Sequence, residues 1–173
     1  MTDLWTACGH YLEQARSLVA RLKPAQFASP HAHCYGGSIG GHVRHCLEHF
    51  DGFRRGLEAG AIDYDARRRG TPDESNPELA AQRLDDLIGW FGSEADRFGT
   101  GDRVRVKIDC GADSDDPSWE WSTVGRELQF LASHTVHHFA IIGIMCEAQS
   151  IPTDPDFGVA PSTLKSQRTE AAS

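Results

Sequence analysis

The sequence contains no long hydrophobic run. Its longest apolar stretch, FAIIGIMC, is far shorter than the ~20 residues that are needed to span a bilayer. The N-terminal segment MTDLWTACGHYLEQAR also lacks the apolar core of a secretory signal. We therefore expect a cytoplasmic protein that has no membrane partner.

Cysteines are few, and clustered positive charge is scarce. The five cysteines form no CxxC pair, and their odd number favours reduced thiols over a disulfide framework. The formal net charge is -8, whereas binding to nucleic acid requires clustered Lys and Arg. The run Arg67, Arg68 and Arg69 is the exception, and such a run is most often a solvated loop. We expect no nucleic-acid partner.

The composition is that of one compact domain. The chain has 173 residues, of which 39% are hydrophobic and 24% are charged, as is usual for a soluble protein with a single core. Four segments combine apolar residues at helical spacing with helix start and stop signals. The predicted helices run from about Asp3 to Lys23, from Ser38 to Ala59, from Asn76 to near Gly99, and from Ser122 or Thr123 to about Gln149. Residues 1–150 are predicted to form this single domain.

The remaining segments are predicted to be a loop, a hairpin and a tail. The segment AIDYDARRRGTPDESN is rich in turn formers and is predicted as a loop. RVRVKIDC alternates charged and apolar residues and WEWS follows the turn GADSDDP, which predicts a small β-hairpin insert between the third and fourth helices. Residues 151–173 are predicted to form an extended C-terminal tail, from which Phe157 could pack back onto the domain.

Two histidines stand four residues apart in the last predicted helix. At about 100° of turn per residue, His134 and His138 fall with Phe130, Leu131 and Met145 in the middle of one apolar face. They could share one metal ion, because neutral imidazole is a common metal ligand and these positions are neighbours on a helix. The alternative is a pair of core histidines that are satisfied by hydrogen bonds. The pair alone leaves both interpretations open.

A third ligand could come from the second predicted helix. In GGSIGGHVRHCLEHF, the residues His42, His45 and His49 form a stripe beside the apolar face. His45 is the sharper candidate, because Gly41 and Gly52 lie beside it and would allow another backbone to approach. For His42 and His49 a solvated helix edge, where any polar residue would serve, remains equally open.

Several known metal motifs are absent. Thr135 stands where a zincin motif requires glutamate, no glutamate forms a Glu-x-x-His pair, and zinc-finger cysteine spacing is missing. Three histidine nitrogens would leave coordination positions for water or substrate, which is typical of a catalytic site. Three neutral ligands also leave the charge of the ion uncompensated, and this favours an anionic ligand such as hydroxide, thiolate or carboxylate.

These histidines, with Ser38 seven positions before His45, resemble the DinB/YfiT-like helical-bundle metalloproteins. That family carries one histidine on an early helix and two histidines four residues apart on a late helix, as in HTVHHFAII here. The resemblance covers roughly residues 1–150 and implies an all-α, antiparallel four-helix bundle of up-down-down-up type, with the loop 61–75 as its long crossover. It also implies that His45, His134 and His138, and no other histidine, bind a divalent transition metal such as zinc, nickel or iron.

Glu127 and Tyr64 are the candidate catalytic residues. Glu127 lies two turns before His134 on the same face, so it could act as a general base or orient a ligating histidine. The alternative is a first-turn carboxylate that the helix dipole favours. Tyr64 and Arg67, in the loop after the second helix, could hold an anionic substrate, and the alternative is that both are surface groups.

The resemblance implies an enzyme that acts on a small-molecule substrate. One form is a thiol S-transferase or isomerase in which the metal activates a low-molecular-weight thiolate, and the other is a hydrolase that uses metal-bound water. A non-catalytic metal-binding or sensing module is a further alternative. We favour the transferase, because a bound thiolate needs no carboxylate base and the sequence fixes none. Self-association into a homodimer is left open.

Overall fold

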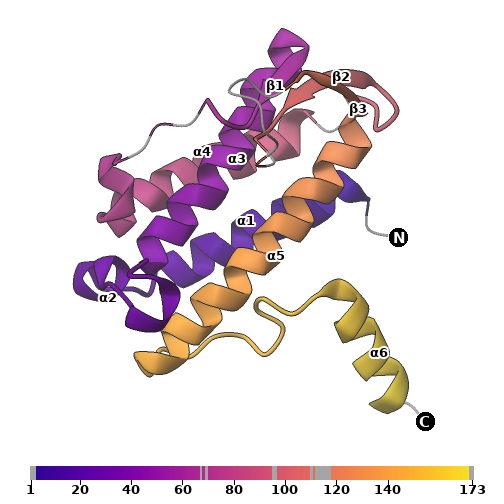
Figure 1. Cartoon of the computed structure of the whole chain (residues 1–173). Helices are drawn as coiled ribbons and strands as arrows, with labels where there is room; N and C mark the ends of the chain where they lie inside the picture. The colour runs from indigo at the N-terminus through magenta and orange to yellow at the C-terminus, as the bar shows by residue number, and fades with distance from the viewer. Residues whose placement is uncertain are drawn as a thin grey trace.

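The protein is mostly helical, with a small sheet at one end of the helices (Figure 1). The computed structural model describes residues 3–66, 68, 70–94, 97–109, 111 and 118–171. Its long helices pack against one another, and they are α1 (Leu4–Val19), α3 (Ile39–Ala59), α4 (Pro77–Glu94) and α5 (Val124–Ala148). The prediction of a helical protein is confirmed.

Two short helices, α2 (Pro24–Ala28) and α6 (Pro161–Ala171), were not predicted. The first predicted helix was expected to reach Lys23, but it ends at Val19. Pro24 then begins α2. Proline has no backbone N–H, but the N–H groups of the first helical turn form no hydrogen bonds within the helix, so proline is favoured there. The third predicted helix is also shorter than expected, since residues 97–99 are not helical.

The two helices that carry the histidine motifs begin and end close to the predicted residues. Ser38 caps α3 by accepting a hydrogen bond at Oγ from the Gly41 N–H at 3.0 Å. Gly60 closes the same helix in the left-handed conformation, at a φ of 74°, which glycine adopts without strain. Thr123 caps α5 in the same manner as Ser38 caps α3.

The sheet has three strands in the order β1, β2, β3: β1 (Ala61–Asp63), β2 (Arg103–Lys107) and β3 (Glu120–Thr123). β2 and β3 pair antiparallel, and β1 pairs parallel to β2 with Ile62 opposite Val106. The prediction of a plain loop is therefore wrong, because β1 forms in that segment and adds a third strand beside the two that were predicted. A Cβ on Gly56 of α3 would lie only 2.6 Å from the Cα of Ile62, so this glycine allows β1 to pack directly on the helix.

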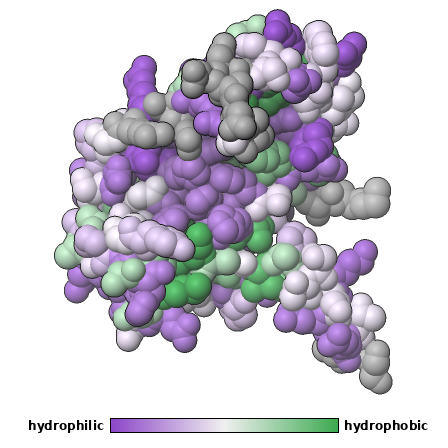
Figure 2. All heavy atoms as spheres, in the orientation of Figure 1, coloured by the Kyte–Doolittle hydropathy of each residue, from purple (hydrophilic) through white to green (hydrophobic). Residues whose placement is uncertain are grey.

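The C-terminal segment packs on α5 and then leaves the body of the protein. The Phe157 ring stacks on Phe139 with ring centroids 4.6 Å apart, as expected for a residue that packs back. The prediction of an extended tail is wrong beyond this point, because Pro161–Ala171 forms α6. Figures 1 and 2 show α6 standing apart from the other helices, with hydrophobic atoms exposed beside the gap.

The core lies between the long helices. Trp5 of α1, Phe50 and Phe53 of α3, and Phe91 of α4 are buried and in ring contact. α3 also packs along α5, and this contact brings the histidines of the two helices together. None of the described helices is both long and apolar enough to cross a membrane.

Candidate metal centre

Three histidines converge between α3 and α5. His45 comes from α3, His134 and His138 come from α5, and one ligand nitrogen of each lies within 4.8 Å of the others. Nε2 of His45 is 2.9 Å from Nε2 of His134, and the rings of His45 and His138 have centroids 4.5 Å apart. The structure therefore brings together the three residues that were predicted as ligands.

The helix α5 presents its two histidines beside the core rather than inside it. Leu131, Thr135 and Phe139 form the buried face of this helix, whereas His134 and His138 are half-buried. The expectation that the pair lies in the middle of the apolar face is corrected, because packing rotates that face away from the histidines. An ion at this edge would still be within reach of a ligand from solvent.

His138 is held in its neutral form. Burial, which is the largest cause, and the neighbouring imidazoles of His134, His42, His137 and His49 together lower its pKa from 6.5 to about 3. A metal binds imidazole through the lone pair of a neutral ring. His138 is thus in the protonation state that a ligand requires.

His42 contacts His138 from the first turn of α3. Nδ1 of His42 lies 2.8 Å from Nδ1 of His138, so the two rings share a hydrogen bond. Burial lowers the pKa of His42, and the charge of His137 adds to this effect. The sequence left open whether His42 is a solvated edge residue. Its place three residues before His45 was the available signal, but only the packing of α3 on α5 puts it against His138.

His49 is buried behind the three histidines. Its side chain is 4% exposed, and its Nδ1 lies 2.9 Å from the backbone oxygen of His45, to which it can donate. The ring centroids of His49 and His134 are 4.2 Å apart. The solvated-edge interpretation is therefore wrong for His49, which supports the rings of two candidate ligands.

Tyr64 and Glu127 form a buried pair that reaches the histidines through His49. The Tyr64 hydroxyl donates to Oε2 of Glu127 at 3.1 Å, and the hydroxyl of Ser122 donates to Oε1 at 2.5 Å. The Tyr64 ring, which is 2% exposed, stacks on His49 with centroids 5.5 Å apart. The surface alternative for Tyr64 is therefore wrong. Arg67, which was grouped with Tyr64, lies outside the described residues.

The donor set fits a divalent transition metal. Imidazole suits zinc, nickel and iron, and a three-histidine site with open positions is a known arrangement for catalytic zinc. Within the described part of the chain, the histidine group is the one cluster of His, Cys, Asp and Glu side chains with converging ligand atoms. The described contacts of Glu127 are with Tyr64 and Ser122, so this carboxylate is held in place behind the ligands.

Comparisons with known proteins place the chain in a family. It is similar to FK506-binding protein 5 of Rhizopus delemar, with 29% identity over 105 residues, which are 60% of this chain and 27% of that protein. The chain thus spans about a quarter of the length of this relative. No solved structure matches the chain. The sequence profile of the DinB superfamily matches residues 12–142, which include all three candidate ligands. The resemblance predicted from the histidine motifs is confirmed, and the chain belongs to the DinB superfamily.

Proposed function

We propose that this protein binds one divalent transition metal through His45, His134 and His138. The convergence of their three ligand nitrogens within 4.8 Å carries the proposal. Membership of the DinB superfamily supports it, because the match includes α3 and the part of α5 that carries both histidines. The proposal extends to a four-helix bundle of up-down-down-up type formed by α1, α3, α4 and α5, with the long crossover between α3 and α4.

The proposed activity is thiol S-transfer or isomerisation with a low-molecular-weight thiol. A divalent metal held by three neutral nitrogens would favour a thiolate as a further ligand and so keep the thiol deprotonated. Both oxygens of Glu127 already accept hydrogen bonds, from Tyr64 and Ser122. A carboxylate that is engaged in this way is a poor base for activating water, and this favours the thiol reaction over hydrolysis.

The surrounding side chains would position the ligands. His42 contacts Nδ1 of His138 and so leaves the other nitrogen of that ring for the metal. His49 is fixed by the backbone oxygen of His45 and packs on His134. Tyr64 stacks on His49 and is itself held by Glu127, so we propose a positioning role for both rather than proton transfer.

Metal content tests the first part of the proposal. Protein purified without an affinity tag, because histidine-rich chains scavenge nickel from columns, should contain about one metal per chain. The variants H45A, H134A and H138A should each lose most of it, whereas H10A should keep it, because His10 is exposed on α1. Full occupancy in H134A would exclude this site.

Cobalt substitution separates the candidate activities. A thiol that binds the metal should add thiolate-to-cobalt absorption bands to the spectrum of the cobalt protein, and H138A should show none. Ester or amide hydrolysis without such bands would favour the hydrolase. Metal binding with neither thiolate bands nor hydrolysis would favour a sensing or structural role.

A further inference from the structure

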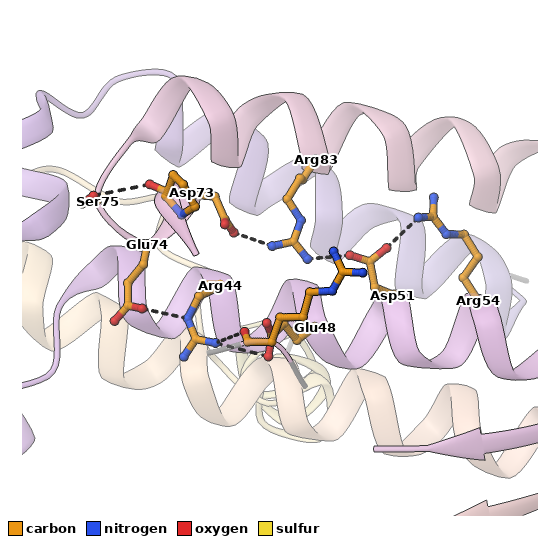
Figure 3. Close-up of polar contacts among 10 residues, drawn as sticks. Arg44, Glu48, Asp51, Arg54, Asp73, Glu74, Ser75 and Arg83 are labelled. Atoms are coloured by element: carbon orange, nitrogen blue, oxygen red, sulfur yellow. Dashed lines mark hydrogen bonds and ion pairs between the residues drawn. The ribbon is translucent and has the colours of Figure 1, made fainter. Parts of the chain in front are cut away.

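A second polar cluster lies on the face of α3 opposite the histidines. At about 100° per residue, Asp51 is rotated roughly 200° from His49 around the helix. The cluster is drawn in Figure 3, and it joins α3 to α4 and to the segment 68–75. It is therefore separate from the candidate metal centre.

The acidic side chains of this cluster are paired with arginines. Arg83 of α4 bridges Asp51 and Asp73 (Figure 3), and Arg54 donates to Asp51 at 2.7 Å. Both carboxylates are buried, and Asp51 is held by two arginines, Arg54 and Arg83.

Arg44 extends the network toward the segment between β1 and α4. It pairs with Glu48 at 3.2 Å and with Glu74 at 3.1 Å, and its Nη1 donates to the backbone oxygen of Arg68 at 3.2 Å. This last bond holds the Arg68 backbone against α3. A segment that the sequence indicated as a solvated loop is therefore held at Arg68.

A cavity of about 380 Å³ opens between these elements. Its lining includes the paired carboxylates, together with Arg55, Arg68 and Thr71. Among the described residues, neither Arg55 nor the Arg68 side chain forms an ion pair. Oγ1 of Thr71 is buried without a hydrogen-bond partner in the same part of the structure, although buried hydroxyls are nearly always paired.

We propose that this cavity binds a small phosphate-bearing molecule. The lining carries four arginines and three carboxylates, so its net charge is +1, and Arg55 and Arg68 are the two whose guanidinium groups have no ion pair among the described residues. This excess of positive charge favours an anionic ligand, and the oxygens of a phosphate group can accept from both guanidinium forks and from the Thr71 hydroxyl. The cavity volume lies within the usual range for small-molecule sites, at its lower end.

Inorganic phosphate is the probe that tests the site on the full-length protein. Thermal melting should show a rise in Tm with phosphate beyond that produced by sodium chloride at equal ionic strength, and titration calorimetry should give about one site. Succinate at the same charge should have a much smaller effect. An equal response to chloride or to succinate would overturn the proposal of a phosphate site.

Matched variants locate the binding. R55A, R68A and T71V should weaken phosphate binding, by about tenfold or more for each arginine. R168A removes the same charge from the exposed helix α6 and should bind phosphate as the wild type does. None of these residues takes part in the ion pairs of Arg83 with Asp51 and Asp73, so the variants should remain folded. Unchanged binding in the double variant R55A/R68A would overturn the proposal, whatever the metal content of the protein.

Discussion

Each histidine has two ring nitrogens, and the neighbours of His138 decide which of them can bind a metal. If Nε2 binds the ion, Nδ1 must carry the proton and donate it to an acceptor. His42 supplies this acceptor at 2.8 Å. Both rings are half-buried, so a water molecule cannot freely replace this hydrogen bond.

Replacement of His42 should therefore weaken metal binding without removing a ligand. We expect H42A to raise the metal dissociation constant about 10- to 100-fold, which is typical for loss of a residue that orients a ligand. H42Q should recover much of the affinity, since its amide oxygen can accept from Nδ1 of His138. Competition with a chromophoric chelator measures both constants. H42A with wild-type affinity would show that His42 does not orient the site.

Tyr64 is the second residue whose environment has a measurable consequence. Burial raises its pKa well above 10, and the charge of Glu127 and the hydrogen bond to it raise the pKa further. In the unfolded chain the phenol ionises near its ordinary pKa of about 10. Between these two values the unfolded state binds fewer protons, so this contribution to stability is complete below about pH 10 and is lost as the pH rises above it.

The variant Y64F should be less stable than the wild type at neutral pH, by about 1.5–3 kcal/mol, because Glu127 loses a donor in a buried position. Its free energy of unfolding should also fall less steeply above about pH 10. Denaturant unfolding at a series of pH values tests both. If the free energy of unfolding fell equally steeply for Y64F and the wild type above that pH, the raised pKa of Tyr64 would be contradicted.

At the scale of elements, β1 depends on α3 for its position. Gly56 has no side chain, and a Cβ there would be 2.5 Å from the Ile62 side chain and 2.6 Å from the Ile62 Cα. The backbone contact cannot be relieved by a rotamer change. The sheet therefore packs on α3 only because this position is glycine, and the sheet in turn places Tyr64 directly after β1.

We expect G56A to destabilise the protein by about 1–3 kcal/mol, because an added methyl group must displace β1. The matched control is G89A on α4, where a Cβ would meet nothing within 4 Å. This control should be about 0.5–1 kcal/mol more stable than the wild type, because alanine favours a helix over glycine. Urea unfolding compares the two variants. Equal stability of G56A and G89A would show that β1 can shift freely.

At the scale of the whole molecule, the metal should add stability to a fold that does not require it. The aromatic core around Trp5 and Phe53 lies away from the three histidines, on the α1 and α4 side of α3. Metal binding to the folded chain stabilises it by mass action. Protons compete with a metal for imidazole nitrogens, whose ordinary pKa is about 6.5. His138, with its pKa of about 3, takes up a proton only at much lower pH.

Removal of the metal by a chelator should lower the Tm at about pH 8 and have much less effect at about pH 5. The metal-free protein should keep its helical circular dichroism spectrum at both pH values. An unchanged Tm at the higher pH would mean that no metal is bound there or that the unfolded chain binds it equally well.

The local sequence of this protein determined the two helices that carry the histidines and the identity of the three candidate ligands. Ser38, Gly60 and Thr123 act on the backbone within one turn, so their effect can be predicted without knowledge of the rest of the chain. The spacing of His134 and His138 is likewise a property of a single helix. Family membership follows from the same short-range patterns.

Only the tertiary structure decided how these elements meet. β1 exists because β2 offers it a parallel partner and Gly56 lets it approach, and neither condition is visible in three residues of sequence. The crossing of α3 and α5 put His42 against His138. The packing of the sheet buried Tyr64 beside His49 and Glu127. Contacts between residues far apart in the chain depend on the distances between elements, and those distances are set by how the whole core packs.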